Sequence, residues 1–153
     1  MARAGFYAVQ NSHIRFGRDG VWYADGEPIA NARIAELFAR HIRRTDDGSY
    51  VIEMDVERAP VEVDDTPYVV IGVDTDGAGA IHLELNDRTR EELDPSTLEV
   101  GEHDVLYCRV KAGAERARFL RPAYYQIAPL IAEDGRGGFV LRLGGDRHRI
   151  GGA

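Results

Sequence analysis

The segment IAELFARHIRRTDDGSYVIEM, residues 34–54, contains the unit on which the fold is expected to be built. Its apolar residues recur at spacings of three and four, which places one apolar stripe along a helix of about three turns. An acidic-glycine turn follows, and an alternating strand led by an aromatic residue comes next. The stripe consists of Ile34, Leu37, Phe38 and Ile42.

Polar residues set the predicted limits of this helix. Asn31 is expected to be the N-cap, because its side chain can accept hydrogen bonds from the free N–H groups of the first turn. Arg43 and Arg44 are placed in the last turn, where the helix dipole favours cations. The sequence Asp46-Asp47-Gly48 is expected to end the helix, and His41 is interpreted as a satisfied residue at the edge of the stripe.

Two short strands are expected before the helix. HIRFGR, residues 13–18, alternates as a half-buried strand does, and VWYA, residues 21–24, returns as its partner after the Asp19-Gly20 turn. Trp22 and Tyr23 point to opposite faces of the second strand. Trp22 is therefore either a core anchor held between two tight turns or part of the wall of a ligand groove.

The second half of the chain repeats this order. YYQIAPLIAEDGRGGFVLRL, residues 124–143, again gives a helix, an acidic-glycine turn and an aromatic-led strand. Pro122 is expected to open this helix, whose stripe continues to Ile131, and Pro129 is expected to kink or shorten it. The sequence therefore predicts an α+β fold with a duplicated β–β–helix–β–β unit and mixed, mostly antiparallel sheets.

The other segments are expected to be strands joined by polar turns. Residues 87–97 are polar and predict a connector with one helical turn. We place an N-terminal unit at residues 1–74 and a C-terminal unit at residues 75–153. Further strands are predicted at residues 50–54, 59–63, 67–74, 80–85, 104–110, 116–120, 139–143 and 147–150.

Charge and composition exclude several classes of partner. With a net charge of −7 over 153 residues, the chain is a poor binder of duplex nucleic acid, because that affinity rests on lysine and arginine displacing counterions. The single cysteine, Cys108, excludes an internal disulfide and suits a reducing compartment. The longest apolar run, residues 68–73, is far shorter than the ~20 residues of a membrane span, and the first residues carry no signal-peptide core. We expect a soluble cytoplasmic protein with no membrane partner.

Six segments in this order give the chain a resemblance to the DUF1285 family, bacterial proteins of unknown function. The most specific run extends from Asp47 to Tyr68 and contains Glu57-Arg58 and an Asp65-x-Pro67-aromatic element. The matching segments are IRFGRDGVW (14–22), DGEPI (25–29), IAELFARHI (34–42), DDGSYVIEMDVERAPVEVDDTPYVV (46–70), YCRVKAG (107–113) and RPAYYQIAPLI (121–131).

The resemblance carries expectations about fold and ligand. It implies a duplicated core of mixed helix and sheet, with a C-terminal half superficially like pleckstrin-homology folds. It also implies a ligand, nucleotide-like in character, in a groove between the two halves. This sequence departs from the family pattern because no Trp-Asn-Pro-Pro-like leader precedes the first strand. A groove walled by that leader would be more open here or filled differently.

Motifs for metal binding and catalysis are incomplete. DTDGAGAIHLEL, residues 74–85, starts like a calcium loop, but Leu85 stands where a bidentate glutamate is needed, so a β-hairpin is expected. His82 and Glu84 would share a strand face, which gives a metal site as the weaker alternative to a solvated face. Cys108 lies in an alternating strand and is interpreted as a small buried thiol. We predict no catalytic residue, no metal and no cofactor.

Aromatic and charged residues in the family-like segments are the candidate ligand contacts. Arginine can hold a phosphate through its planar fork, and tyrosine can stack on a base while its hydroxyl bonds elsewhere. The simpler alternative is that the charged groups pair with one another at the surface. The candidates are Trp22, Glu57, Arg58, Asp65, Tyr68, Arg121, Tyr124 and Tyr125.

These features favour a binding module of bacterial regulation and signal transduction over an enzyme. The expected ligand is a small nucleotide-like molecule in the groove between the two units. The first alternative is a small enzyme that acts on a nucleotide or a phosphorylated metabolite, which would need an acid–base pair in the groove. The second is an adaptor protein, which would expose a contiguous apolar patch. The sequence leaves open whether the chain forms a homo-oligomer.

Overall fold

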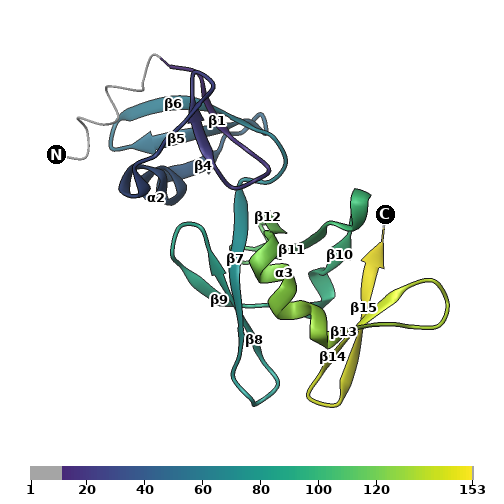
Figure 1. Ribbon diagram of the computed structural model, residues 1–153. Helices are drawn as coiled ribbons and strands as arrows, with labels where there is room; N and C mark the ends of the chain where they lie inside the picture. The colour runs from purple at the N-terminus through teal and green to yellow at the C-terminus, as the bar shows by residue number, and fades with distance from the viewer. Residues whose placement is uncertain (1–11, 153) are drawn as a thin grey trace. The chain divides into compact units, whose positions relative to one another are not determined.

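The computed structural model describes residues 12–152, which divide into two compact units (Figure 1). The first unit ends at Pro67 and the second begins at Tyr68. Both units combine an open β-sheet with an α-helix, so the predicted α+β class is confirmed. Within the described residues, no helix is long and apolar enough to cross a membrane.

The first unit has a six-stranded sheet and one α-helix between its third and fourth strands. Its elements are β1 (Ile14–Phe16), β2 (Trp22–Ala24), β3 (Glu27–Pro28), α2 (Ala32–His41), β4 (Ile42–Arg44), β5 (Tyr50–Met54) and β6 (Glu57–Val63). The strands lie in the order β3-β2-β1-β6-β5-β4. Neighbouring strands are antiparallel except β1 and β6, which run parallel.

Helix α2 begins as predicted but ends earlier. The Asn31 side chain accepts hydrogen bonds from the backbone N–H groups of Arg33 (2.9 Å) and Ile34 (3.3 Å), which confirms the N-cap. The prediction that Arg43 and Arg44 form the last helical turn is wrong. The backbone turns extended at Ile42, with φ −69° and ψ 135°, because this buried residue pairs with β5 as the first residue of β4.

The segment predicted to end the helix has a different role. Asp46-Asp47-Gly48 forms the turn of the β4–β5 hairpin, in which the N–H of Thr45 donates to the carbonyl of Ser49 at 2.8 Å. The Arg43 guanidinium donates to the carbonyl oxygens of Arg40 (3.2 Å) and Ile42 (2.8 Å). Arg43 therefore bonds carbonyls at the end of the helix from a strand position.

The core of the first unit is centred on Trp22. Its side chain is 2% exposed, and its ring centroid lies 4.7 Å from that of Phe16 and 5.6 Å from that of Phe38. Phe38 meets the indole edge-on at an interplanar angle of 75°. The interpretation of Trp22 as a core anchor is confirmed, and the Asp25-Gly26 pair that follows it turns the chain with positive φ at both residues.

The second unit has a nine-stranded sheet. Its elements are β7 (Tyr68–Thr75), β8 (Ile81–Leu85), β9 (Arg90–Glu92), η1 (Pro95–Thr97), β10 (Glu99–Val100), η2 (Glu102–Asp104), β11 (Leu106–Val110), β12 (Glu115–Phe119), α3 (Arg121–Ile127), η3 (Ala128–Leu130), β13 (Ile131–Glu133), β14 (Phe139–Leu143) and β15 (Asp146–Gly152). The strand order is β13-β14-β15-β10-β11-β12-β7-β8-β9.

Six strands of this sheet repeat the topology of the first unit. The order β12-β11-β10-β15-β14-β13 matches β3-β2-β1-β6-β5-β4, with the helix again between the third and fourth strands. The first and last strands of each repeat, β1 with β6 and β10 with β15, pair in parallel. The predicted duplication is confirmed, although three strands rather than two lie on each side of the helix.

The second helix is shorter than its apolar stripe suggested. Helix α3 ends at Ile127, and Pro129 lies in the single 3-10 turn that follows. Ile131, predicted as part of the helix stripe, is the first residue of β13 and pairs with Leu141. Pro129 has no N–H with which to continue the helix, so the predicted shortening is confirmed and the extension to Ile131 is wrong.

Strands β7, β8 and β9 have no counterpart in the first unit. They extend the second sheet beyond β12, to which β7 is paired in parallel. The predicted hairpin over residues 74–85 is formed by β7 and β8. The connector predicted at 87–97 does hold one helical turn, η1, but it also contains β9, a three-residue strand too short and too charged to show an apolar alternation.

Replacing Phe38 with alanine is expected to lower the free energy of unfolding of the first unit by about 3–5 kcal/mol, because the side chain is fully buried against Trp22. Urea denaturation followed by tryptophan fluorescence measures the change, since Trp22 is the only tryptophan. Val56→Ala is the control, because Val56 is 93% exposed and its truncation should cost little. Equal midpoints for the two variants would contradict the assigned core.

Candidate functional site

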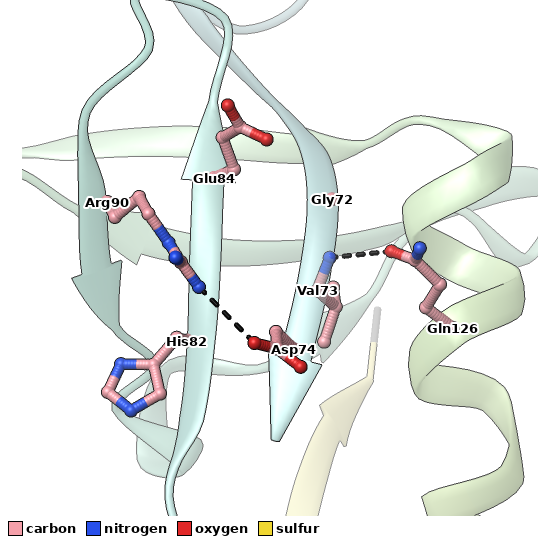
Figure 2. Close-up of a pocket in the computed structure, with 7 residues that line it drawn as sticks. All are labelled: Gly72, Val73, Asp74, His82, Glu84, Arg90 and Gln126. Carbon is pink, nitrogen blue, oxygen red and sulfur yellow. Dashed lines mark hydrogen bonds and ion pairs between the residues drawn. The ribbon is translucent and has the colours of Figure 1, made fainter. Parts of the chain in front are cut away.

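A polar recess lies on the second unit, where β7, β8 and β9 meet helix α3 (Figure 2). Its volume is about 380 Å³, within the size range of small-molecule pockets. Every lining residue belongs to the second unit, so the recess is defined by that unit alone. The lining residues are Gly72, Val73, Asp74, His82, Glu84, Arg90 and Gln126.

Strand alternation places the ionisable side chains on one face of the sheet. In β8 the apolar residues Ile81, Leu83 and Leu85 are buried, and His82 and Glu84 between them point to the other face. Cross-strand pairing sets their neighbours: Asp74 lies opposite His82 on β7, and Arg90 lies opposite Glu84 on β9. The predicted sharing of one face by His82 and Glu84 follows from the β8 pairing.

A glycine forms the floor of the recess. Gly72 follows a register shift in β7 and lies opposite Glu84. A Cβ atom at this position would lie 3.7 Å from Glu84 Oε1 and 3.8 Å from Gln126 Oε1. Figure 2 shows Gly72 between these two side chains. The absence of a side chain therefore leaves a hollow with an oxygen atom on either side.

Helix α3 supplies the other wall through Gln126. Its Oε1 accepts a hydrogen bond of 2.6 Å from the backbone N–H of Val73. Since only the amide oxygen can accept from an N–H group, this bond fixes the orientation of the carboxamide. It also ties the helix to a strand that is distant in sequence.

The charged groups around the hollow are held by long contacts. Arg90 reaches from β9 across β8 towards Asp74, with 3.5 Å between Nη2 and Oδ2 (Figure 2). Arg88 Nη1 lies 3.5 Å from Glu84 Oε2. The side chains of Asp74 and Glu84 are 73% and 40% exposed. Exposed pairs of this kind contribute at most about 1 kcal/mol each, so a ligand could replace them.

His82 is anchored at the rim by Asp76. The two side chains are 3.2 Å apart at Nε2 and Oδ2. Backbone N–H groups of Ala78 and Ala80, followed by His82, hold the pKa of Asp76 below its ordinary value. Asp76 therefore stays ionised at neutral pH and fixes the position of the imidazole.

The sequence-based candidates from the first unit lie in four different settings. Trp22 is in the core. Arg58 lies on β6, where its guanidinium is 2.6 Å from Glu53 Oε2 and 66% exposed, so it forms a surface ion pair. Glu57 is half-buried at the start of β6, and Asp65 is half-buried after its end.

The structure brings three candidates of the second unit onto one helix. Arg121, Tyr124 and Tyr125 are all exposed on α3, and the two tyrosine ring centroids are 6.0 Å apart. Tyr68 is instead 7% exposed, with the ammonium of Lys111 4.9 Å from its ring centroid. A ligand groove between the two units, with contacts from both sets of candidates, stays a prediction.

Sequence reasoning did not select the residues of the recess as ligand contacts. For His82 and Glu84 the sequence indicates a metal site only as the weaker alternative, and Gly72 stands inside an apolar run that predicts a strand. A glycine within such a run signals a bulge or a close approach, and this was the usable signal. Within residues 12–152, no group of three histidine, cysteine, aspartate or glutamate side chains could hold a metal ion.

The only lysine of the chain forms a second polar cluster. Lys111 Nζ lies 2.6 Å from Asp87 Oδ2 and 3.1 Å from Thr89 Oγ1. The Asp87 side chain is 5% exposed. Burial raises the pKa of Asp87, but hydrogen bonds from Lys111 and Thr89 outweigh it and hold that pKa below its ordinary value. The cluster is a buried ion pair that joins the turn after β11 to the turn before β9.

Cys108 has the structural role expected of it. The residue is 1% exposed in β11, and burial raises the pKa of its thiol to about 12. A thiol with this pKa stays protonated at neutral pH and is a poor nucleophile. The interpretation of Cys108 as a small buried core residue is confirmed.

Fold and recess together define an α+β protein with a duplicated six-stranded unit and a polar pocket beside the second copy. Residues 7–66 match the model of the N-terminal domain of DUF1285, a domain of unknown function. The resemblance to the DUF1285 family is thereby confirmed. A comparison with curated proteins finds no match.

Two solved structures share the fold. A DUF1285 family protein from Silicibacter pomeroyi DSS-3 is 22% identical, with a TM-score of 0.72 over 91% of this chain and 79% of that chain. A DUF1285 family protein from Shewanella baltica OS155 is 20% identical, with a TM-score of 0.62 over 78% of this chain and 93% of that chain. At these identities the likeness extends to the fold alone.

Lys111→Met is expected to lower the free energy of unfolding by about 3–5 kcal/mol at pH 7, because it leaves the Asp87 carboxylate buried without its cation. Urea denaturation measures the loss. Arg109→Met is the control, because it removes an exposed cation two residues earlier, in β11. If both variants lose the same stability, Lys111 has no special role.

The same pair predicts a pH dependence. Because the pKa of Asp87 is lowered by folding, its contribution is present above its unfolded pKa of about 3.9 and is lost as the pH falls through the folded value. Unfolding free energies measured between pH 7 and pH 2 should therefore fall less steeply for the Asp87→Asn, Lys111→Met double variant than for the parent. Parallel curves would contradict the assignment.

Proposed function

We propose that this chain is a ligand-binding module and that the recess on its second unit binds a small polar molecule. The observation that carries the proposal is the hollow over Gly72, with Glu84 on one side and Gln126 on the other. A side chain at this position would fill the hollow, whereas glycine leaves room for a ligand beside charged groups of both signs.

Weak internal pairing supports this proposal. Asp74 and Glu84 each meet an arginine at 3.5 Å, longer than the 2.7–2.9 Å typical of a strong charged hydrogen bond. A ligand with complementary groups can form shorter bonds to these side chains at little cost to the fold. In contrast, the Lys111–Asp87 pair is short and buried, as expected for a structural contact.

A second candidate ligand is the nucleotide-like molecule expected from the sequence, bound on α3. It is favoured by the exposure of Tyr124 (37%) and Tyr125 (63%) beside Arg121 at the start of the same helix. A base can stack on a tyrosine ring, and the arginine fork can bind a phosphate. Both candidate ligands stabilise the folded protein if they bind, so one experiment compares them.

Gly72→Val is expected to abolish ligand-induced stabilisation by filling the hollow. A thermal-shift screen of the whole protein with amino acids, diamines, dicarboxylates, sugars and nucleotides tests the parent first, since a ligand at 100 times its Kd stabilises a protein by about 2.7 kcal/mol. The matched control is Gly152→Val, a strand glycine of the same unit with open space around it. If every shift survives in Gly72→Val, the recess is not the binding site.

Arg121→Ala separates the second candidate from the first. A nucleotide bound on α3 should lose its thermal shift in this variant, because the phosphate loses its guanidinium, whereas a ligand in the recess should keep its shift. The measurement uses the same panel and adds Arg136→Ala as a control in an exposed loop of the same unit. A nucleotide shift that Arg121→Ala leaves intact would place that ligand elsewhere.

A further inference from the structure

The recess also indicates the chemical class of its ligand, an inference that rests on the proposed function. The geometry points to a zwitterion that carries both an ammonium and a carboxylate group, as an amino acid does. The two charged ends of such a molecule match two different parts of the recess.

The ammonium is assigned to the hollow over Gly72. A Cβ atom at residue 72 would lie 3.7 Å from Glu84 Oε1 and 3.8 Å from Gln126 Oε1, so these two oxygens flank the space above the glycine. Both atoms can accept hydrogen bonds, because one is a carboxylate oxygen and the other is an amide oxygen identified by its bond from the Val73 N–H group. An ammonium group offers three donors and no acceptor, so it complements this pair of oxygens.

The negative charge of Glu84 is only partly compensated within the described residues. Its ion-pair partner is Arg88, at 3.5 Å from Oε2, and Oε1 faces the hollow. Arg90 lies opposite Glu84 on β9, but its guanidinium approaches Asp74. A cation over Gly72 would therefore gain a charge-assisted hydrogen bond that the unliganded protein leaves unmade. A carboxylate in the same place would face Glu84 at close range and be repelled.

The carboxylate of the ligand is assigned to Arg90. Its guanidinium extends over the recess (Figure 2), and its contact with Asp74 is long at 3.5 Å. The planar fork can donate two parallel hydrogen bonds to a carboxylate. A second ammonium at this end would meet the guanidinium as well as the Asp74 carboxylate, whereas a ligand carboxylate can take the place of Asp74 on Arg90, so a zwitterion matches the recess better than a diamine.

The spacing of the two ends limits the size of the ligand. Gly72, at the ammonium end, and Asp74, which Arg90 approaches, are two residues apart on β7, or about 6.6 Å along a strand. The recess of about 380 Å³ can hold a single amino acid and has room for its side chain. The candidate ligands are therefore short ω-amino acids, whose two ends can span this separation, whereas an α-amino acid carries both groups on one carbon and reaches only one end.

The test is calorimetric titration of the whole protein with four probes: an α-amino acid panel, 4-aminobutyrate, putrescine and succinate. We expect at least one zwitterion to bind, and the matched diamine and dicarboxylate to bind more weakly. Glu84→Gln and Arg90→Gln should each weaken that zwitterion by about 10- to 100-fold, because each removes a charged hydrogen bond. Glu133→Gln, an exposed carboxylate of the same unit outside the recess, should leave the affinity unchanged.

The outcomes separate this inference from the proposed function. If putrescine or succinate binds, no zwitterion does, and Gly72→Val abolishes the binding, the ligand class is wrong and the recess is still a binding site. If a zwitterion binds equally to the parent, Glu84→Gln and Gly72→Val, its site lies elsewhere and both proposals fail. If no zwitterion in the panel binds, the inference about ligand class is overturned, whatever the broader screen finds.

Discussion

The parallel pairing of the first and last strands of each six-stranded repeat is the constraint on which the fold depends. In the first unit, Ile14 pairs with Val61 and Phe16 pairs with Val63. The six-stranded sheet is therefore complete only when the first and last strands of the repeat meet. A parallel pair cannot be made by a tight turn and needs a long connection. The helix lies within that connection, between hairpins that form on either side of it. Neither half of the repeat therefore completes the sheet without the other.

The sequence predicted the features of this fold that depend on residues adjacent in the chain, namely caps, turns and proline positions. Asn31 caps the first helix, the Asp19-Gly20 turn joins the first hairpin, and Pro122 lies at the start of the second helix. The end of the helix before Ile42 was not predictable from the apolar stripe. An apolar residue at this position suits a further helical turn and a buried strand residue paired with β5 equally well. Two-residue strands such as β10 show no alternation and are fixed only by distant partners.

The candidate site likewise has some features that residue type predicts and others that depend on contacts between distant segments. Residue type drew attention to exposed arginines and tyrosines, and the structure does gather three of them on α3. The recess depends instead on a register shift in β7 and on Gln126, which is distant in sequence from Gly72. Neither glycine nor glutamine is chemically distinctive by itself. The two residues can be recognised as parts of one recess only after tertiary contacts have brought β7 and α3 together.

The three added strands make the two copies of the repeat structurally unequal at one sheet edge. In the first copy, the sheet ends at β3, a two-residue edge strand whose Pro28 has no N–H to offer a further strand. In the second, the equivalent edge strand β12 accepts β7, and the recess is built on that extension. Of these two equivalent edges, only the one in the second copy carries further strands within the described residues. Substitutions at the solvent-facing positions of β8 and β9 can change the lining of the recess without touching either six-stranded framework.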